Sequence, residues 1–331
     1  MNPHPSSAER SAGLGEFELI RRHFERPVRR AALGVGDDCA LLRVSPGMQL
    51  AVSTDMLVEG RHFLSTVEPA RLGHKALAVN LSDLAACGAR PLAFTLGLSL
   101  PRADEAFVAG LAQGLFALAQ AHDIELVGGD TTAGPLNLCI TVMGEVPAGQ
   151  ALLRSGARPA DELWVSGQLG DARLALEVFR GRVALGGDGF EQVRAAMEQP
   201  QPRVGLGLAL RGVATAAIDL SDGLIGDLGH ILQRSGVGAQ VEIGQLPHSA
   251  VLAAQPAALR QECLLAGGDD YELLFCAPPE RRAAVLQAAG QAQVPVHRIG
   301  RITAEPGLQV LDQAGQPLDL SRLQPFDHFQ S

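Results

Sequence analysis

Aspartates that follow glycine, serine or threonine recur along this 331-residue chain, and their carboxylates are the groups best suited to chemistry in it. The segment AIDLSDGLIGDL places Asp219, Asp222 and Asp227 in a stretch that is otherwise apolar and rich in glycine. A buried strand that runs into a helix should carry no charge unless that charge is paired. Related segments are GDD at 36–38, STD at 53–55, SD at 82–83, GGD at 128–130 and GGDD at 267–270.

Asp83 lies on the apolar face of a predicted helix. In the segment EPARLGHKALAVNLSDLAACG, the residues Leu72, Ala76, Val79 and Asp83 follow one another at steps of three or four, which places them on one helical stripe. An ionised carboxylate on that stripe is costly unless it is paired or bound to a metal. The alternative interpretation is a capping or a buried, hydrogen-bonded aspartate.

Several of the other aspartates follow predicted strands. Asp130 comes directly after IELVGG, Asp55 ends LAVSTD, and Asp219 and Asp222 lie at the end of ATAAIDL. The carboxyl ends of strands are where α/β proteins place ligand groups. Turn aspartates and helix caps are the alternatives, with Ser221 or Asp222 as the cap. We interpret Asp227 as an exposed helix residue.

The aspartates taken together indicate a metal site. Carboxylates that converge repel one another and raise their own pKa values, and divalent cations remove that cost. Hard oxygen ligands, without the His and Cys spacing of a zinc site, favour Mg²⁺. Because Mg²⁺ usually completes its shell with phosphate oxygens and water, an acidic protein of this kind is predicted to bind a nucleotide through magnesium.

Composition excludes several other classes of function. The formal charge of -9 provides no basic surface for nucleic acid. No apolar run approaches the length of a membrane span, and the N-terminal segment lacks the apolar core of a signal peptide. The cysteines, without a CxxC pair, are predicted to be core residues of a cytoplasmic protein; they are Cys39, Cys87, Cys139, Cys263 and Cys276.

Strands and helices alternate along the chain, which predicts an α+β or α/β protein of two domains. We place the N-terminal domain at 1–148 and the C-terminal domain at 149–331. The segment 179–192 is predicted to be a surface loop. Predicted strands are 49–53, 93–100, 124–127, 138–146, 163–166, 215–220, 239–243, 271–276 and 296–302, and predicted helices are 69–87, 104–122, 171–180 and 223–234.

The ordered set of motifs resembles the thiamine-monophosphate kinase family, which belongs to the superfamily of aminoimidazole ribonucleotide synthetase and selenophosphate synthetase. The motifs span nearly the whole chain: they are GVGDDCALL (34–42), STDMLVEGRHF (53–63), KALAVNLSDLAACGARP (75–91), ELVGGDTT (125–132), LLRSGARP (152–159), IDLSDGL (218–224), GGDDYELLF (267–275) and FDHF (326–329).

This resemblance implies transfer of the γ-phosphoryl group of ATP to thiamine monophosphate, giving thiamine diphosphate in the last step of its biosynthesis. It also implies several Mg²⁺ ions and a homodimer in which the N-terminal sheets pair, with a C-terminal α/β sandwich completing the substrate site. The acceptor is a phosphate oxygen that is already ionised at neutral pH, so the reaction needs charge neutralisation and positioning rather than a general base.

Carried over position by position, the resemblance assigns three groups of residues. The metal ligands it implies are Asp38, Ser53, Thr54, Asp55, Asp83, Asp130, Asp219 and Asp222. The ATP contacts it implies are Gly129, Asp130, Arg154 and Ser221. The contacts to thiamine monophosphate it implies are His62, Asp270 and Phe326. The residues closest to the transferred phosphoryl group would be Asp55, Asp83, Asp130 and Arg154.

Outside the resemblance, some of these residues have ordinary structural interpretations. Arg154 is then a surface arginine, His62 a structural histidine, and Phe326 a core or docking aromatic. Four positions depart from the family pattern: Phe326 replaces a tryptophan, Asp269 a glutamate, Phe116 a tyrosine and Ala160 a glycine. The change at Ala160 matters only if its turn needs a positive φ.

Two other functions remain compatible with the residues. A hydrolytic ATPase would result from a degenerate acceptor pocket, and a regulator would bind nucleotide or thiamine without turnover. Formation of ADP from ATP would indicate an enzyme, because a regulator binds its ligand without turnover.

Overall fold

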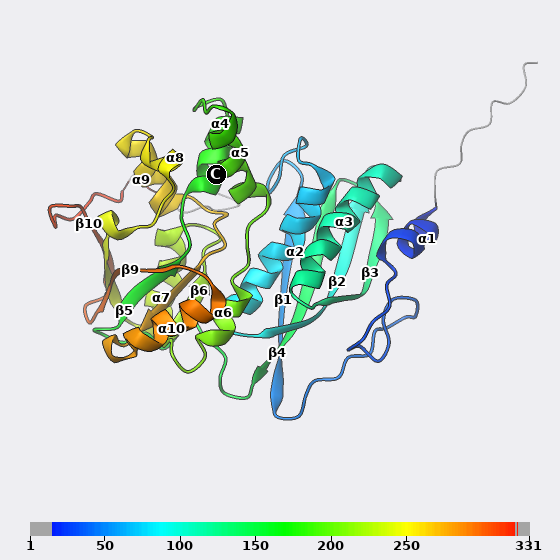
Figure 1. Ribbon diagram of the computed structural model, residues 1–331, viewed down its shortest axis with the longest axis horizontal. Helices are drawn as coiled ribbons and strands as arrows, with labels where there is room; N and C mark the ends of the chain where they lie inside the picture. Colours follow the sequence, from blue (N-terminus) through cyan, green and yellow to red (C-terminus); the bar gives the residue numbers. More distant parts are fainter. Residues whose placement is uncertain (1–14, 322, 324–331) are drawn as a thin grey trace, which may run out of the picture.

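A computed structural model describes residues 15–321 and 323 and arranges their strands in two sheets (Figure 1). Phe326 lies outside the described residues, so its predicted contact with the acceptor stays a prediction. Within the described ranges, none of the helices combines the length and the apolar character that crossing a membrane requires.

The N-terminal sheet has four strands in the order β1-β4-β2-β3. Neighbouring strands are antiparallel except for β2 and β3, which are parallel. Figure 1 shows α2 and α3 side by side over one face of this sheet. The elements are α1 (Glu16–Leu19), η1 (Ile20–Phe24), β1 (Met48–Val58), α2 (Pro69–Ala86), β2 (Arg90–Leu100), α3 (Glu105–Ala121), β3 (Glu125–Ala133) and β4 (Asn137–Pro147).

The C-terminal sheet has six strands in the order β10-β7-β9-β5-β8-β6. Its strands are β5 (Glu162–Ser166), β6 (Ala216–Asp219), β7 (Gly238–Glu242), β8 (Leu273–Ala277), β9 (Val296–Thr303) and β10 (Gly307–Leu311). Its helices are α4 (Asp171–Phe179), α5 (Gly187–Glu198), α6 (Val204–Ala209), α7 (Leu224–Ser235), η2 (Ile243–Gln245), α8 (Ala250–Ala253), α9 (Ala257–Ala266), η3 (Pro279–Arg281) and α10 (Arg282–Ala292).

Helix α2 forms as its sequence predicts. Pro69 occupies the first turn, where its missing N–H costs nothing, and Leu72, Ala76 and Val79 are buried on one stripe. Asp83 continues this stripe and is half-buried. The prediction that this carboxylate faces inward is confirmed.

Two strands run further than predicted. β1 pairs with β4 as far as Val58, so Asp55 lies within the strand rather than at its end. β3 pairs with β2 as far as Ala133, so Asp130 is also inside a strand. Polar residues ended the predicted strands too early, because an edge strand with one open face tolerates serine, threonine and aspartate. Asp219 is the last residue of β6, which ends one residue before the predicted limit at 220.

The loop predicted at 179–192 is only partly correct. Helix α5 begins at Gly187 and runs to Glu198, with Val193 and Met197 buried against the C-terminal core. Because glycines at the start of this helix are typical of loops, the composition of the segment predicts a loop there. The apolar side chains at 193 and 197 nevertheless have helical spacing.

One hydrophobic core joins the two sheets through α2. It includes α2 and α3 residues together with Trp164 of β5, Leu206 of α6 and Phe275 of β8. α6 approaches α2 closely at Gly207, where a Cβ atom would overlap the carbonyl oxygen of Ala85. This close packing sets α2, and hence Asp83, beside the C-terminal domain.

The second face of the N-terminal sheet is only partly covered. Near β2 and β3, Val28 and Leu42 of the segment before β1 pack over it. On β1 the side chains of Leu50, Val52 and Met56 are 44%, 57% and 52% exposed. Alternate residues of β1 therefore present an apolar surface on the face opposite α2.

Ala160 has a φ of 75°, so the turn before β5 does require the left-handed region. A glycine there avoids the steric cost of a Cβ atom. We expect Ala160→Gly to raise the free energy of unfolding by about 1 kcal/mol. Urea denaturation measures the change. Ala258→Gly, on the exposed side of α9, serves as the control and should lower stability by about 1 kcal/mol. A loss of stability at both positions would contradict the assignment of strain to Ala160.

Candidate active site

Five aspartates gather where α2 meets the end of β6 and the start of α7. We call Asp55, Asp83, Asp219, Asp222 and Asp227 the central carboxylate cluster. Their charges act on one another: Asp83 and Asp222 raise the pKa of Asp55, Asp83 and Asp227 raise that of Asp219, and Asp222 raises that of Asp227, in each case after the larger effect of burial. The motifs of β1, α2 and β6 therefore lie within electrostatic range of one another, and their role as one site stays a prediction.

The N-terminal half of this cluster is held by hydrogen bonds from α2. The hydroxyl of Ser53 donates to Oδ2 of Asp83 at 2.5 Å. The backbone N–H of Asp55 donates to Oδ1 of Asn80 at 3.2 Å, and Nδ2 of Asn80 donates in turn to the carbonyl of Ala76. A strand and a helix far apart in the sequence are thus fixed against each other at the site.

Asp227 is buried, not exposed as its position in α7 suggested. Its Oδ2 accepts hydrogen bonds from the backbone N–H groups of Asp222 and Gly223, each at 3.1 Å. The carboxylate therefore fixes the turn between β6 and α7, which places Asp222 and Ser221. The interpretation of Asp227 as a surface residue is wrong, because the apolar face of α7 turns its first-turn aspartate inward.

Arg154 supplies positive charge to the cluster from the segment between the two sheets. Its charge lowers the pKa of Asp83 and of Asp227, against the larger upward effect of burial on both. The guanidinium side chain belongs to an exposed residue, so it is open to a ligand. A planar, permanently charged group in that position suits a phosphate.

Burial and mutual repulsion oppose ionisation of the aspartates in the cluster. Burial, with the charges of Asp83 and Asp222, raises the pKa of Asp55 to about 6. Burial and the charge of Asp222 raise the pKa of Asp227 to about 7. Neighbouring carboxylates that resist ionisation are the arrangement a divalent cation relieves.

The donor set fits Mg²⁺ but is incomplete without further oxygens. In the part of the chain that the structure describes, no three His, Cys, Asp or Glu side chains converge closely enough to hold a metal ion by themselves. Carboxylate and hydroxyl oxygens are nevertheless the ligands Mg²⁺ prefers, and it retains water and phosphate in its shell.

Gly129 and Asp130 do not join the central carboxylate cluster within one chain. They lie in β3, three strands from Asp55 in β1, because the sheet order is β1-β4-β2-β3. The register pairs Asp55 with Ile140, Ile140 with Leu96, and Leu96 with Gly129. At a strand spacing of about 4.8 Å, this separation is roughly 14 Å.

A second group of predicted residues lies around β3. A cavity there is lined by Phe24, Val35, Gly129 and Asp130, among others. Asp38 follows Val35 by three residues and is exposed. Thr54 turns away from the cluster: its hydroxyl is 2.8 Å from that of Thr141 on the opposite face of the sheet.

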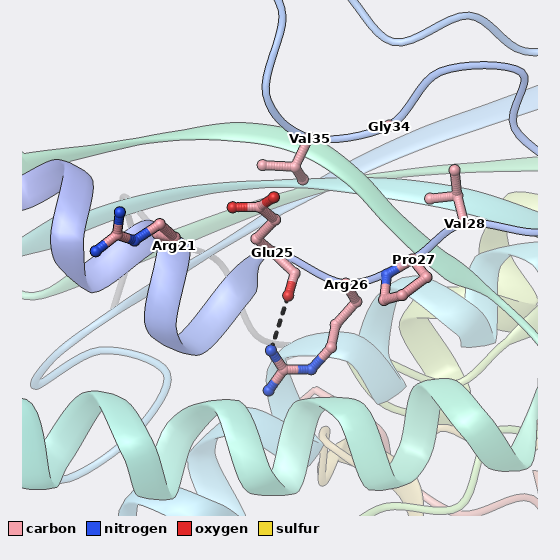
Figure 2. Close-up of a pocket in the computed structure, with 7 residues that line it drawn as sticks. All are labelled: Arg21, Glu25, Arg26, Pro27, Val28, Gly34 and Val35. Atoms are coloured by element: carbon pink, nitrogen blue, oxygen red, sulfur yellow. Dashed lines mark hydrogen bonds between the residues drawn. The ribbon is translucent and has the colours of Figure 1, made fainter.

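An open cavity of about 520 Å³ adjoins this β3 region. It lies between the residues after η1 and the segment of Gly34 and Val35, and Val35 also lines the cavity that contains Asp130 (Figure 2). Arg26 donates to the carbonyl oxygen of Glu25 at 2.8 Å, and its guanidinium lies 4.8 Å from the ring centre of Phe116. An aromatic ring thus remains in place at the position where the family carries a tyrosine.

Two of the residues predicted to contact the acceptor, His62 and Asp270, lie outside the helices and strands. Nδ1 of His62 accepts from the backbone N–H of Val58 at 3.0 Å, so one ring nitrogen has a structural role. Oδ1 of Asp270 accepts from the N–H of Gly170 at 2.9 Å. Burial, with the nearby charges of Glu272, Asp171 and Asp269, raises the pKa of Asp270 well above its usual value.

Sequence reasoning missed the residues that position the others. Asn80 and Lys75 lie on the buried side of α2, one and two turns before Asp83, which is the signal that would have found them. Tyr271 is buried close to Asp55 and Asp219, whose charges contribute, after burial, to raising its pKa. Its position in GGDDYELLF gave no sign of that proximity.

Comparison with known proteins identifies relatives over the whole fold. Residues 36–146 match the family model described as AIR synthase related protein, N-terminal domain, and residues 158–313 match the corresponding C-terminal domain. The chain is 46% identical over 323 residues to the thiamine-monophosphate kinase of Salmonella typhimurium strain LT2, which covers 95% of this chain and 98% of the relative.

Two solved structures are similar as well. The thiamine-monophosphate kinase of Stenotrophomonas maltophilia K279a has a TM-score of 0.82 and 45% identity, over 91% of this chain and 95% of that one. AaThiL complexed with AMPPCP and TMP has a TM-score of 0.76 and 29% identity, over 87% of this chain and 89% of that one.

The raised pKa of Asp55 predicts a pH-dependent effect of its removal. Because its folded-state pKa of about 6 exceeds the ordinary value of 3.8, the folded protein binds this proton more tightly than the unfolded chain does. Stability is therefore lost as the pH rises from about 4 through about 6. Asp55→Asn, which does not ionise, should stabilise the metal-free protein by about 2 kcal/mol at pH 8 and little at pH 4.

Urea denaturation at the two pH values, without nucleotide or magnesium, measures this difference. An equal gain in stability at both values would show that ionisation of Asp55 in its buried site, beside Asp83 and Asp222, is not its cause.

Proposed function

Since the chain belongs to the thiamine-monophosphate kinases of the AIR synthase related family, we propose that it phosphorylates thiamine monophosphate with ATP and that the central carboxylate cluster is the centre of this reaction. The product is thiamine diphosphate. The relatives named for this activity match nearly the full chain, and a structural neighbour is complexed with AMPPCP and TMP.

The observation that carries the proposal is the gathering of five partly buried aspartates whose burial and mutual repulsion raise the pKa values of Asp55, Asp219 and Asp227. Two phosphate-bearing substrates must approach each other, and their anions repel both each other and the protein. Mg²⁺ would supply the neutralising charge when bound, and the residues we propose to hold it are Asp38, Ser53, Asp55, Asp83, Asp130, Asp219 and Asp222. The side chain of Thr54 is not among them, because its hydroxyl faces away from the cluster. Arg154 adds a fixed cation that orients a phosphate.

The protein's own contribution is positioning. Ser53 and Asn80 fix Asp83 and Asp55, and Asp227 fixes the turn that bears Ser221 and Asp222. The acceptor oxygen is already ionised at neutral pH, so no side chain has to remove a proton from it. Rigid support of the charged groups then accounts for the rate, as in other phosphoryl transfers.

We propose further that the complete site forms in a homodimer. Asp130 lies at the opposite edge of the sheet from Asp55, about 14 Å away, which is too far for one ion to bind both within a chain. The apolar face of β1, with Leu50, Val52 and Met56 exposed, offers a surface for a second copy. Pairing of two such sheets would bring β3 of one copy towards β1 of the other.

Mixed dimers test this arrangement. Asp55→Asn and Asp130→Asn should each reduce turnover by more than about 100-fold while leaving the fold intact. Random assortment of the two variant chains makes half of the dimers mixed, and each mixed dimer has one site with both native aspartates. Refolding or co-expressing the variants together should therefore restore about one quarter of the wild-type specific activity.

The matched control is a mixture of Asp55→Asn chains and Asp83→Asn chains. Both substitutions affect the central carboxylate cluster, which each chain supplies by itself. No mixed dimer then contains an intact site, so activity should stay at the level of the single variants. Equal failure of both mixtures would contradict a site shared between copies. Near wild-type turnover by Asp130→Asn alone would remove that residue from the site.

A single assay tests the reaction itself. We expect the purified protein to convert ATP and thiamine monophosphate into equal amounts of ADP and thiamine diphosphate, resolved by chromatography, and only when magnesium is present. ADP without thiamine diphosphate would indicate a hydrolytic ATPase. Binding of both ligands by calorimetry without ADP would indicate a regulator. Calcium or EDTA in place of magnesium provides the control.

We also propose a cytoplasmic location. The cysteines Cys39, Cys87, Cys139, Cys263 and Cys276 are all free thiols. Free thiols, one of them exposed, suit a reducing compartment that also supplies ATP.

A further inference from the structure

Lys75 is a buried lysine at the boundary between the two domains. It projects from α2, and its side chain is only 3% exposed. Its Nζ donates to Oδ2 of Asp269 at 2.7 Å and to the carbonyl oxygen of His62 at 3.2 Å. Burying an ammonium group is costly unless partners of this kind compensate for it, so the position has a more specific cause than core packing.

The segment that Lys75 contacts has an unusual backbone. Asp269 and Tyr271 have φ values of 68° and 50°, a region that residues other than glycine rarely occupy. Their N–H groups donate to the carbonyls of Ser221 and Leu220, at 2.9 and 2.8 Å. The hydroxyl of Tyr271 donates to Oδ1 of Asp269 at 3.1 Å. Strained residues persist only where their surroundings hold them, and here Lys75 and these bonds do so.

Lys75 therefore links the three segments around the acceptor. Through the carbonyl of His62 it holds the loop after β1, and through Asp269 it holds the segment 267–272, which includes Asp270. That segment is bonded to the turn at Ser221. The β3 region with Asp130 has no hydrogen bond or ion pair with Lys75 among the described residues.

We propose that Lys75 is a positioning residue for the phosphate acceptor, fixing the His62 loop of one domain at a set distance from segment 267–272 of the other. Its low exposure leaves no room for it to bind a phosphate itself. The inference rests on the proposed function, because thiamine monophosphate is the acceptor that these loops would hold.

Steady-state kinetics of Lys75→Met test this role. We expect KM for thiamine monophosphate to rise at least 10-fold and KM for ATP to stay within about twofold of wild type. The matched control is Arg71→Met, on the same helix one turn earlier. Arg71 also joins the two domains, through Glu191 and Glu198, and among the described residues it has no hydrogen bond or ion pair with the His62 loop or with segment 267–272. The Arg71→Met variant should have a lower melting temperature than the wild type and unchanged KM values for thiamine monophosphate and ATP.

Asp269→Asn provides a second variant should Lys75→Met not yield folded protein. Asparagine tolerates a positive φ and keeps an oxygen for Lys75 but removes the charge, so KM for thiamine monophosphate should rise by a smaller factor. In the double variant, the effect on KM should be clearly less than the product of the two single effects, because one ion pair is lost in all three proteins.

The opposing results are distinct. If Lys75→Met or Asp269→Asn lowers only the active fraction and the melting temperature, or raises both KM values equally, Lys75 is merely structural and the inference is wrong. If the wild-type protein makes no thiamine diphosphate, the proposed function fails first, and this inference falls with it.

Discussion

Electrostatic repulsion among the aspartates around α2 is the constraint on which the rest of the site depends. Folding brings Asp55, Asp83 and Asp219 into a partly buried volume where their charges oppose one another. Natural proteins retain such an arrangement only where something repays its cost to stability. A site that is unfavourable when empty binds cations and their phosphates more tightly, since occupancy relieves the strain that folding built in.

Helix α2 is the element that converts this constraint into a defined geometry. One of its faces is buried in the core shared by both domains, and Gly207 allows α6 to approach its backbone. Polar residues of α2 each hold a different part of the site. Lys75 binds the His62 loop and segment 267–272, Asn80 binds the backbone of β1, and Asp83 binds the hydroxyl of Ser53. A helix packed on both sides cannot shift for one of these contacts without disturbing the others.

The sequence predicts the aspartates of the candidate site better than it predicts the residues that position them. Helical spacing leaves only one face for Asp83, and the structure buries that face. The apolar run around Asp219 locates β6 to within one residue at each end. Asp55 and Asp130 were placed at strand ends, since a local pattern does not reveal how far pairing with β4 or β2 extends. Asp227 and Lys75 are polar residues whose burial depends on partners distant in the sequence, and no local signal reports such partners.

The sheet order adds a requirement that no single motif contains. The aspartate motifs are predicted from the sequence to form one set of ligands. In the fold they lie in two separate groups, because β1 and β3 form opposite edges of the sheet. Within one chain the central carboxylate cluster and the Asp130 region stay apart, and the exposed apolar side chains of β1 form the surface on which we propose that a second copy docks. Association and catalysis would then depend on the same surface, because the face that buries Val52 on pairing also determines which aspartates meet.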